Sequence, residues 1–219
     1  MNPGPTIFVV DDNPTTRQAL ARLLESAGFR AETYSRAQAF LDAYDPTRPG
    51  CVLLDIRMPG MSGLELQDAL TRQRIRVPVI IVSAHDQVEN VVRAVKRGAV
   101  DFIKKPYRSQ ILLDRIHQAL ELDARQRQQD SKRAAAAARV ATLSPREREI
   151  MDLLAAGLSA KAIAFRLHIS RSTVDIHRMH LMNKLQASSV VDLVQLARLC
   201  SGEAAGQPAS SELTLPSPD

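Results

Sequence analysis

The sequence has few of the residues that stabilise secreted or membrane proteins. Its 219 residues include two cysteines, no tryptophan and 4% aromatic residues. Cys51 and Cys200 cannot form a disulfide framework, so we expect reduced thiols. No apolar run approaches the roughly 18 residues that a membrane span needs. The first five residues lack the charged and apolar regions of a secretory signal, so we expect a cytoplasmic protein with no membrane partner.

The charged residues are unevenly distributed. Residues 1–122 hold 16 Lys and Arg against 14 Asp and Glu, residues 123–140 hold 5 against 2, and residues 141–200 hold 8 against 5. The last nineteen residues carry three acids and no base. The net charge of +5 therefore comes from the middle and the C-terminal half, where a nucleic-acid partner should be sought.

Apolar runs and helical periodicities alternate along the first 120 residues. Strands are expected at residues 6–10, 31–34, 51–55, 79–83 and 99–103. Helical patterns follow them, beginning near Thr15, Ser35, Leu64, Val88 and Ser109. The fourth of these helices carries an apolar stripe of Val88, Val91, Val92 and Val95. Five such repeats predict an α/β doubly wound fold, in which helices cover both faces of a five-stranded parallel sheet.

Acidic side chains stand where two of these strands end. Asp11 and Asp12 follow the first strand, and Asp55 ends the third. Because parallel strands end at one edge of the sheet, we expect the three carboxylates to crowd together there. Carboxylates in one pocket repel each other, and a bound divalent cation holds them ionised. Their hard oxygen atoms favour Mg²⁺.

Two further polar residues end the fourth and fifth strands. Ser83 and Lys105 can grip the oxygens of a phosphoryl group on Asp55, which would then be a carboxylate nucleophile. The loop after Asp55 contains Gly60 and Gly63, which let the backbone approach a bound ion or phosphate closely. In the alternative interpretation, the acids cap helices or form turns, Ser83 is an ordinary strand-end hydroxyl and Lys105 is solvated.

Four motifs at these strand ends match one known family. They are Val9-Val10-Asp11-Asp12, Leu53-Leu54-Asp55-Ile56-Arg57-Met58-Pro59-Gly60-Met61-Ser62-Gly63, Ser83-Ala84-His85 and Lys104-Lys105-Pro106. Residues 6 to about 122 resemble the receiver domain of two-component response regulators, which has a flavodoxin-like fold. We therefore predict a receiver domain at residues 1–122.

The resemblance implies a phosphoacceptor site with a metal ion. Asp55 would take a phosphoryl group from a phosphohistidine on a sensor histidine kinase. Mg²⁺ would be held by Asp12, Asp55 and the backbone carbonyl of Arg57, with Asp11 acting through water.

The resemblance also implies a switch beside that site. Lys105 would contact the phosphoryl group, and Ser83 and Phe102 would form the switch pair, with the hydroxyl moving toward the phosphoryl group and the ring turning inward. Serine stands here at a position where threonine is also common. The peptide bond before Pro106 is expected to be cis, a conformation largely confined to proline.

Residues 123–140 contain no helix breaker and are rich in Ala, Gln and Arg, which favour helix. They predict a helical linker that extends the preceding helix into solvent. Its basic residues form either a solvated face or a segment beside DNA. Residues 201–219 are rich in Gly, Ala, Ser and Pro and predict a disordered tail.

Residues 141–200 show no strand pattern and predict an all-α domain of four helices. Ser144 and Glu147 form a capping box, with proline at the first helical position. The second helix begins at Ser159, Ser170 caps the third, and the fourth contains Leu193. A tight turn joins the second helix to a third that is rich in Arg, His and Lys. This outline predicts a helix-turn-helix, although other small helical bundles share it.

Specific residues of this domain match a second family. The matching segments are Leu143-Ser144-Pro145-Arg146-Glu147-Arg148-Glu149, Gly157-Leu158-Ser159, Lys161 with Ile163-Ala164, Ile169-Ser170 with Thr173-Val174 and His177, and Lys184-Leu185. They resemble the LuxR-type helix-turn-helix DNA-binding domain of the FixJ/NarL subgroup. The third helix would then enter the major groove of double-stranded DNA.

Helical spacing sorts the side chains of that third helix. Its inward residues are Val174, Leu181 and Leu185. Its outer face, toward the base edges, is formed by Ser172, Asp175, Ile176 and Met179. The candidate phosphate contacts, which position the protein without specifying sequence, are Lys161, Arg171, Thr173, His177, Arg178 and Lys184.

Three positions depart from the usual pattern of this family. Ala160 and Ala162 stand where asparagine and glutamate are frequent, which removes polar contacts near the second helix. Asp175 stands where a lysine is frequent. Its carboxylate either accepts a hydrogen bond from a cytosine amino group or simply weakens DNA binding.

The leading hypothesis is a phosphorylation-dependent transcription regulator rather than an enzyme. Phosphorylation would promote formation of a homodimer that binds promoter DNA, with RNA polymerase as a further partner. One alternative is a receiver that acts through phosphate-independent contacts, but its complete acid set and Lys105 argue against this. Another is an enzyme such as a phosphatase, for which the sequence shows no separate substrate pocket.

Overall fold

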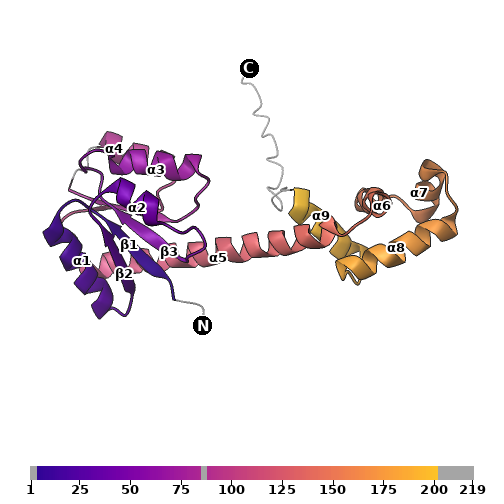
Figure 1. Ribbon diagram of the computed structural model, residues 1–219, viewed down its shortest axis with the longest axis horizontal. Helices are drawn as coiled ribbons and strands as arrows, with labels where there is room; N and C mark the ends of the chain where they lie inside the picture. Colours follow the sequence, from indigo (N-terminus) through magenta and orange to yellow (C-terminus); the bar gives the residue numbers. More distant parts are fainter. Residues whose placement is uncertain (1–3, 85–87, 202–219) are drawn as a thin grey trace, which may run out of the picture. The chain divides into compact units, whose positions relative to one another are not determined.

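The computed structural model describes residues 4–84 and 88–201. It divides into two compact units, Met1–Arg127 and Gln128–Asp219, which are described separately below. Figure 1 shows that the first is an α/β unit and that the second is helical. His85 of the third motif lies outside the described residues, as does the predicted tail after Ser201.

A five-stranded parallel sheet forms the centre of the first unit. Its strands are β1 (Thr6–Val10), β2 (Arg30–Tyr34), β3 (Gly50–Leu54), β4 (Val79–Ser83) and β5 (Asp101–Lys104). They are ordered β2-β1-β3-β4-β5, and each neighbouring pair is parallel. The predicted sheet is confirmed, with strand boundaries that differ from the expected ones by at most two residues.

Helices cover both faces of this sheet. They are α1 (Pro14–Ser26), α2 (Ala37–Ala43), α3 (Gly63–Arg72), α4 (Val88–Lys96) and α5 (Ser109–Ala141). Successive side chains of a strand point to opposite faces, so Phe8 and Val10 pack in one core and Ile7 and Val9 in the other. The first core contains residues of α2, α3 and α4, and the second contains residues of α1 and α5. Both faces are buried, as expected for a parallel sheet.

The apolar stripe of α4 does not pack into the core. Val88, Val92 and Val95 are 72%, 43% and 57% exposed, and Ala94 is the buried residue of this helix. The helical period was predicted correctly, but the side of α4 that meets the sheet is the one carrying Ala94. The stripe is therefore a solvent-facing apolar surface, and such surfaces mark interaction sites.

The second unit contains α6 (Pro145–Ala155), α7 (Ala160–Leu167), α8 (Arg171–Leu185) and α9 (Val190–Ser201). The predicted capping box opens α6: the Ser144 hydroxyl accepts from the Glu147 N–H, and the Glu147 carboxylate accepts from the Ser144 N–H. Ser159 and Ser170 cap α7 and α8 in the same way through their hydroxyls. The four predicted helices are thus confirmed, and their apolar faces share one core.

The segment predicted as an exposed linker is helical, because α5 runs without a break to Ala141. It is not exposed throughout. Asp123 is buried and accepts hydrogen bonds from the Gly50 N–H (3.0 Å) and from Arg127 Nε (2.8 Å). Arg127 also donates to the backbone carbonyls of residues 46–48. These bonds extend the first unit to Arg127, beyond the boundary predicted at residue 122.

Candidate functional site

The strand order creates a crevice at one edge of the sheet. In the strand order 2-1-3-4-5, β2 and β3 lie on opposite sides of β1. The chain therefore reverses its direction across the sheet after β2, and the helices that follow β1 and β3 cover opposite faces. Ligands of open α/β sheets bind at the carboxyl ends of the strands at such a point. Asp11 follows β1 and Asp55 follows β3. The Asp55 N–H donates to Val10 O at 2.9 Å, which holds the two strand ends side by side.

One ammonium group joins the two carboxylates at this edge. Lys105 Nζ lies 2.7 Å from Asp11 Oδ2 and 3.2 Å from Asp55 Oδ1. Burial disfavours the charge of Lys105, but the hydrogen bond it donates to Asp11 and the charge of Asp55 outweigh that effect and raise its pKa. The peptide bond between Lys105 and Pro106 is cis, as the resemblance implied.

Backbone groups fix the remaining oxygens of the two acids. The Asn13 N–H donates to Asp11 Oδ1 at 2.8 Å, and the Arg57 N–H donates to Asp55 Oδ2 at 3.0 Å. Asp11 and Asp55 are 3% and 8% exposed, so both carboxylates are held in place and largely shielded from water. Gly63 lies tightly behind Asp55, since a Cβ added there would come within 2.2 Å of Asp55 O.

One residue of the site was missed from the sequence. Arg17, in the first turns of α1, donates through one guanidinium nitrogen to Asp11 O at 2.7 Å and to Asp12 O at 2.8 Å. These bonds fix the backbone of the acidic pair. No short motif signals them, because they depend on the angle at which α1 leaves the sheet.

The three carboxylates predicted at the metal site are only partly gathered. Asp11 and Asp55 share Lys105, whereas the Asp12 side chain is exposed. Across residues 4–84 and 88–201, no three Asp, Glu, His or Cys side chains form a ready-made metal cluster. Of the three carboxylates expected to lie close together, two, those of Asp11 and Asp55, therefore do so. The donor set still fits Mg²⁺, which binds a few carboxylate or carbonyl oxygens and retains several waters.

Ser83 and Phe102 lie on neighbouring strands on the same side of the sheet. Phe102 is in register with Ile81, two residues before Ser83, and the Lys105 N–H donates to Ser83 O at 2.9 Å. Ser83 is fully buried and Phe102 is half-buried. The geometry thus brings the predicted switch pair and Lys105 to the edge that carries Asp55, while their roles remain predictions.

In the second unit, α7 and α8 form the expected helix-turn-helix. His168, in the turn between them, adopts a left-handed conformation with φ of 52°. Val174, Leu181 and Leu185 are fully buried, as their spacing predicted. The predicted outer face is exposed at all four of its positions, which are Ser172, Asp175, Ile176 and Met179.

The predicted phosphate contacts differ in their surroundings. Lys161 and Arg171 are exposed, and Thr173, His177 and Arg178 are half-buried. Lys184 instead donates to Glu147 Oε2 at 2.7 Å. This bond gives Lys184 a structural partner that spacing along α8 could not predict.

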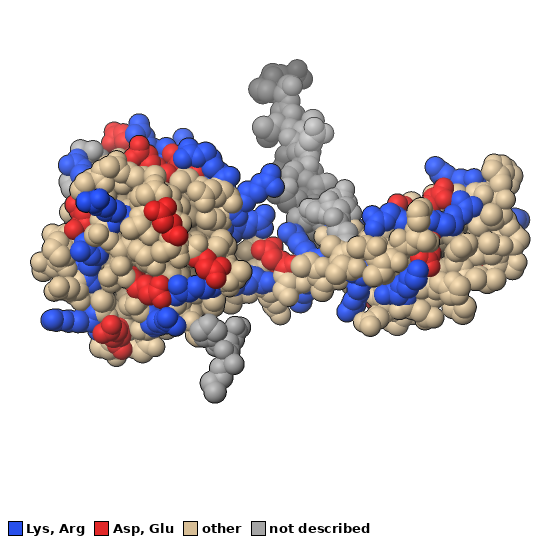
Figure 2. Space-filling model, in the orientation of Figure 1, with Lys and Arg blue, Asp and Glu red and all other residues tan. Residues whose placement is uncertain are grey.

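Several apolar side chains are exposed on the surface of the second unit, among them Ile176, Met179 and Val191. Phe165 of α7 is 84% exposed, and sequence reasoning did not single it out. Figure 2 shows basic side chains on the visible surface of both units, interspersed with acidic ones. None of the described helices is both long and apolar enough to cross a membrane.

These features define a class: a doubly wound α/β domain with an acidic crevice, in one chain with a helix-turn-helix domain. Residues 7–117 match the model of the response regulator receiver domain. Residues 141–197 match that of the bacterial regulatory proteins of the luxR family. The chain therefore belongs to the response regulators that carry a receiver domain and a LuxR-type DNA-binding domain.

Curated relatives and solved structures agree with this family. The chain is 44% identical to the transcriptional regulatory protein FixJ of Bradyrhizobium diazoefficiens, over 87% of this chain and 93% of the relative. It is 42% identical to the transcriptional regulatory protein TdiR of Thauera aromatica, over 86% of this chain and 83% of the relative. The solved structure of the response regulator StyR is 42% identical and superposes with a TM-score of 0.80, covering 90% of this chain and 99% of that one.

The family bears directly on the chemistry of the crevice. Receiver domains accept phosphoryl groups and generally bind Mg²⁺ at their acidic pocket, and LuxR-type domains bind DNA. The relatives are named as regulators of transcription, and neither matched model describes an enzyme family. Phosphorylation-dependent regulation of transcription is thus the general function of the chain.

Proposed function

We propose that Asp55 is the phosphoacceptor of this protein and that a sensor histidine kinase is the donor. A carboxylate oxygen of Asp55 attacks the phosphorus of the phosphohistidine. The new P–O bond forms as the P–N bond breaks, and the imidazole leaves. The observation that carries this assignment is the shared Lys105 ammonium, 3.2 Å from Asp55 Oδ1, because a fixed cation stabilises charge on the transferred oxygens.

The surroundings of Asp55 suit the role of phosphoacceptor better than those of Asp11 or Asp12 do. Asp11 is held by Lys105 and by the Asn13 N–H, and it lies deeper, at 3% exposed. Asp12 is exposed and has no described contact with Lys105. Mg²⁺, held by Asp12, Asp55 and the Arg57 carbonyl with Asp11 acting through water, would neutralise charge on the phosphoryl group. Ser83 would then turn its hydroxyl toward that group, and Phe102 would follow.

The second part of the proposal is that phosphorylation promotes a homodimer that binds promoter DNA. A single LuxR-type domain buries little surface on DNA, so two copies on paired half-sites raise the affinity. The exposed valines of α4 supply an apolar surface for dimerisation. Arg97, directly after α4, pairs with Asp68, and Arg115 of α5 pairs with Asp101, so these charges are already engaged within the chain.

The site of DNA contact is proposed to be α8 with its exposed outer face. Ser172, Asp175, Ile176 and Met179 would meet base edges, and Lys161, Arg171, Thr173, His177 and Arg178 would meet phosphates. The protein would act in the cytoplasm, with RNA polymerase as its partner at the promoter.

The phosphoacceptor assignment is tested with acetyl phosphate and Mg²⁺. The intact protein should gain the mass of one phosphoryl group, and Asp55→Asn should gain none. Asp42→Asn, which changes an exposed acid of α2, is the matched control and should be phosphorylated like the wild type. A stable phosphoryl group on Asp55→Asn protein would refute the assignment.

The dimer is tested by sedimentation with and without phosphorylation. The phosphorylated wild type should shift toward dimer, and Val95→Lys should reduce that shift because it places a charge in the apolar stripe. Val191→Lys, at an exposed valine of α9, is the control and should dimerise normally. Equal monomer fractions before and after phosphorylation would rule this mechanism out.

A further inference from the structure

Asp12 is the exposed member of the proposed metal site. Asp11 and Asp55 are buried and share the Lys105 ammonium, whereas the Asp12 side chain lies open to solvent. An exposed side chain populates several rotamers, and ordering it around a metal ion costs conformational entropy. The affinity for Mg²⁺ therefore depends on how firmly the backbone of Asp12 is held.

Arg17 holds both of the peptide planes that flank the Cα atom of Asp12. One of its guanidinium nitrogens donates to Asp11 O at 2.7 Å and to Asp12 O at 2.8 Å. The first carbonyl belongs to the peptide group before Asp12, and the second belongs to the peptide group after it. Because peptide groups are planar, a residue whose two flanking planes are held has fixed φ and ψ angles. Arg17 thereby sets the direction of the Cα–Cβ bond of Asp12.

Asn13 connects this arrangement to the start of α1. Its N–H, which belongs to the peptide group after Asp12, donates to Asp11 Oδ1 at 2.8 Å. Its side chain caps α1, and its carbonyl accepts from the Arg17 N–H at 3.0 Å. The helix is in turn anchored in the core by Leu20, which is buried. The guanidinium group therefore extends from a fixed element and can hold the loop that carries Asp12.

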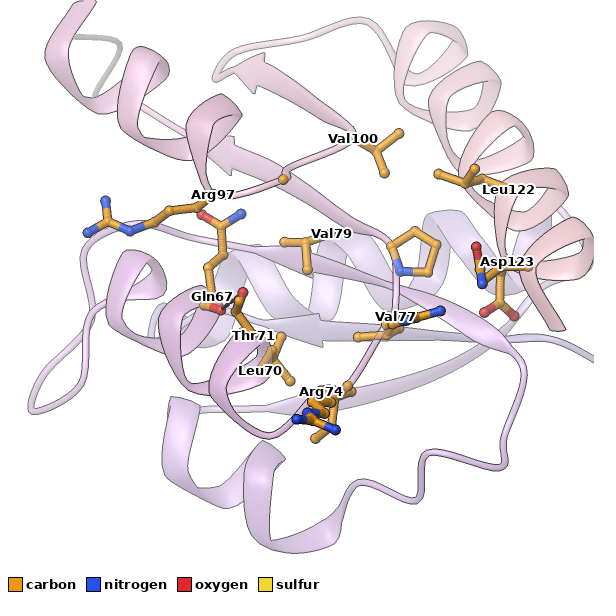
Figure 3. Close-up of a pocket in the computed structure, with 15 residues that line it drawn as sticks. Gln67, Leu70, Thr71, Arg74, Val77, Val79, Arg97, Val100, Leu122 and Asp123 are labelled. Carbon is orange, nitrogen blue, oxygen red and sulfur yellow. Dashed lines mark hydrogen bonds between the residues drawn. The ribbon is translucent and has the colours of Figure 1, made fainter. Parts of the chain in front are cut away.

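The other hollow of this unit is a poor candidate for a competing cation site. Figure 3 shows it between α3, which carries Gln67, and α5, which carries Asp123. Among the described residues that line it, Asp123 is the only acid, and it already accepts from the Gly50 N–H and from Arg127. Gln67 Oε1 is buried without a partner among the described residues, but Mg²⁺ prefers carboxylate oxygens to a single amide. Binding of Mg²⁺ should therefore report on the crevice at Asp55.

We propose that Arg17 is a positioning residue that sets the affinity for Mg²⁺ by holding Asp12 in place. This inference rests on the proposed metal site of Asp12 and Asp55. Outer groups that orient metal ligands change metal affinity by about 10–100-fold when they are removed. The charge of Arg17 acts in the opposite direction, because a nearby cation repels Mg²⁺. Charge alone thus predicts tighter Mg²⁺ binding once Arg17 is replaced, whereas positioning predicts weaker binding.

Calorimetric titration of Mg²⁺ into the unphosphorylated full chain distinguishes the two. Arg17→Met should raise the Kd for Mg²⁺ about tenfold. Arg17→Lys keeps a charge and a donor, so it should recover much of that loss. Arg22→Met, at an exposed arginine of the same helix, is the matched control and should bind like the wild type. An unchanged or lower Kd for Arg17→Met overturns the proposal. Wild-type protein that binds no Mg²⁺ would overturn the metal site itself.

A double-mutant cycle connects the effect to Asp12. Asp12→Asn should itself weaken Mg²⁺ binding, and adding Arg17→Met should cause little further loss, because the ligand that Arg17 holds is already gone. Fully additive losses would contradict the proposal. The thermal midpoint of each variant is measured without Mg²⁺. A lowered midpoint together with wild-type Mg²⁺ affinity in Arg17→Met would mean a structural role only and would also overturn it.

Phosphorylation kinetics separate this inference from the phosphoacceptor assignment. With acetyl phosphate, Arg17→Met should need about tenfold more Mg²⁺ to reach half of its maximal rate, and that maximal rate should match the wild type. A lower rate at saturating Mg²⁺ would contradict a role confined to positioning the metal ligand. Phosphorylation of Asp55→Asn would refute the acceptor and leave the calorimetric result standing, because the titration requires no phosphoryl transfer.

Discussion

The two units each contain a buried carboxylate bonded to a lysine, and the surroundings of the two pairs differ. In the receiver unit, Lys105 is shared between Asp11 and Asp55 at the carboxyl edge of the sheet. In the helical unit, Lys184 donates to Glu147, whose carboxylate also accepts from the Ser144 N–H. The first pair lies where a parallel sheet binds ligands. The second joins the start of α6 to the end of α8.

This difference shows that the function of an acid–lysine pair cannot be inferred from the pair alone, because it depends on the residues around it. The hydrogen bonds from Lys184 and from the Ser144 N–H lower the pKa of Glu147 to about 2, and all of these partners lie within the helical unit. Lys105 contacts two acids and has no capping role, so one of these carboxylates can react while the other still holds the ammonium group. The Lys184–Glu147 pair stabilises the helical unit and is called the brace below. The Lys105 pair at the sheet edge is suited to chemistry.

The strongest test of the comparison exchanges each lysine for methionine. Lys105→Met should slow phosphorylation of Asp55 by acetyl phosphate by roughly 10²-fold, because a preorganised cation is lost. Lys184→Met should be phosphorylated at the wild-type rate and should instead lower the thermal midpoint of the helical unit. Mass spectrometry over time and thermal unfolding measure the two effects. Similar phosphorylation rates in both variants would remove the distinction between the pairs.

A second test concerns the brace and its pH dependence. Glu147→Gln should reduce the free energy of unfolding by roughly 1.5 kcal/mol, since hydrogen bonds to a charged acceptor are lost. Because the folded pKa of Glu147 lies near 2 and below its ordinary 4.5, its contribution is present above pH 4.5 and disappears as pH falls toward 2. The variant should therefore approach the wild type in stability between those values.

The control for this experiment is the exposed pair on the same helix. Glu149 pairs with Arg146 at 2.6 Å, and its side chain is 49% exposed. Exposed ion pairs contribute little, so Glu149→Gln should cost less than about 0.5 kcal/mol at pH 7. An equal loss in both variants would show that the Glu147 pair is not a special brace.

A third test separates base contacts from phosphate contacts on α8. Asp175→Ala should change preference at one base position by roughly 1–3 kcal/mol if its carboxylate meets a cytosine. Arg178→Ala should weaken binding to all sequences and lower the salt slope by about one unit. Titrations against specific and random DNA at several salt concentrations distinguish them. Identical effects of the two substitutions would refute this division.

Much of the receiver site was predictable because it depends on strand ends. Each acid and Lys105 follows a short apolar run, and parallel strands bring such ends to one edge whatever their side chains. The capping box at Ser144 and Glu147 was predictable for a similar reason, since its partners are three residues apart. Local spacing also placed Val174, Leu181 and Leu185 in the core of the helical unit.

Other features depend on contacts between distant parts of the chain, and only the tertiary structure decided them. Lys105 lies 94 and 50 residues from its two acids, and Lys184 lies 37 residues from Glu147. The valine stripe of α4 is periodic, but the packing of the sheet determines that it faces solvent. Sequence patterns specify which residues share a face or a strand end. The packing of these elements against one another then determines which side chains share a hydrogen-bond donor. It also determines which buried oxygen remains unpaired.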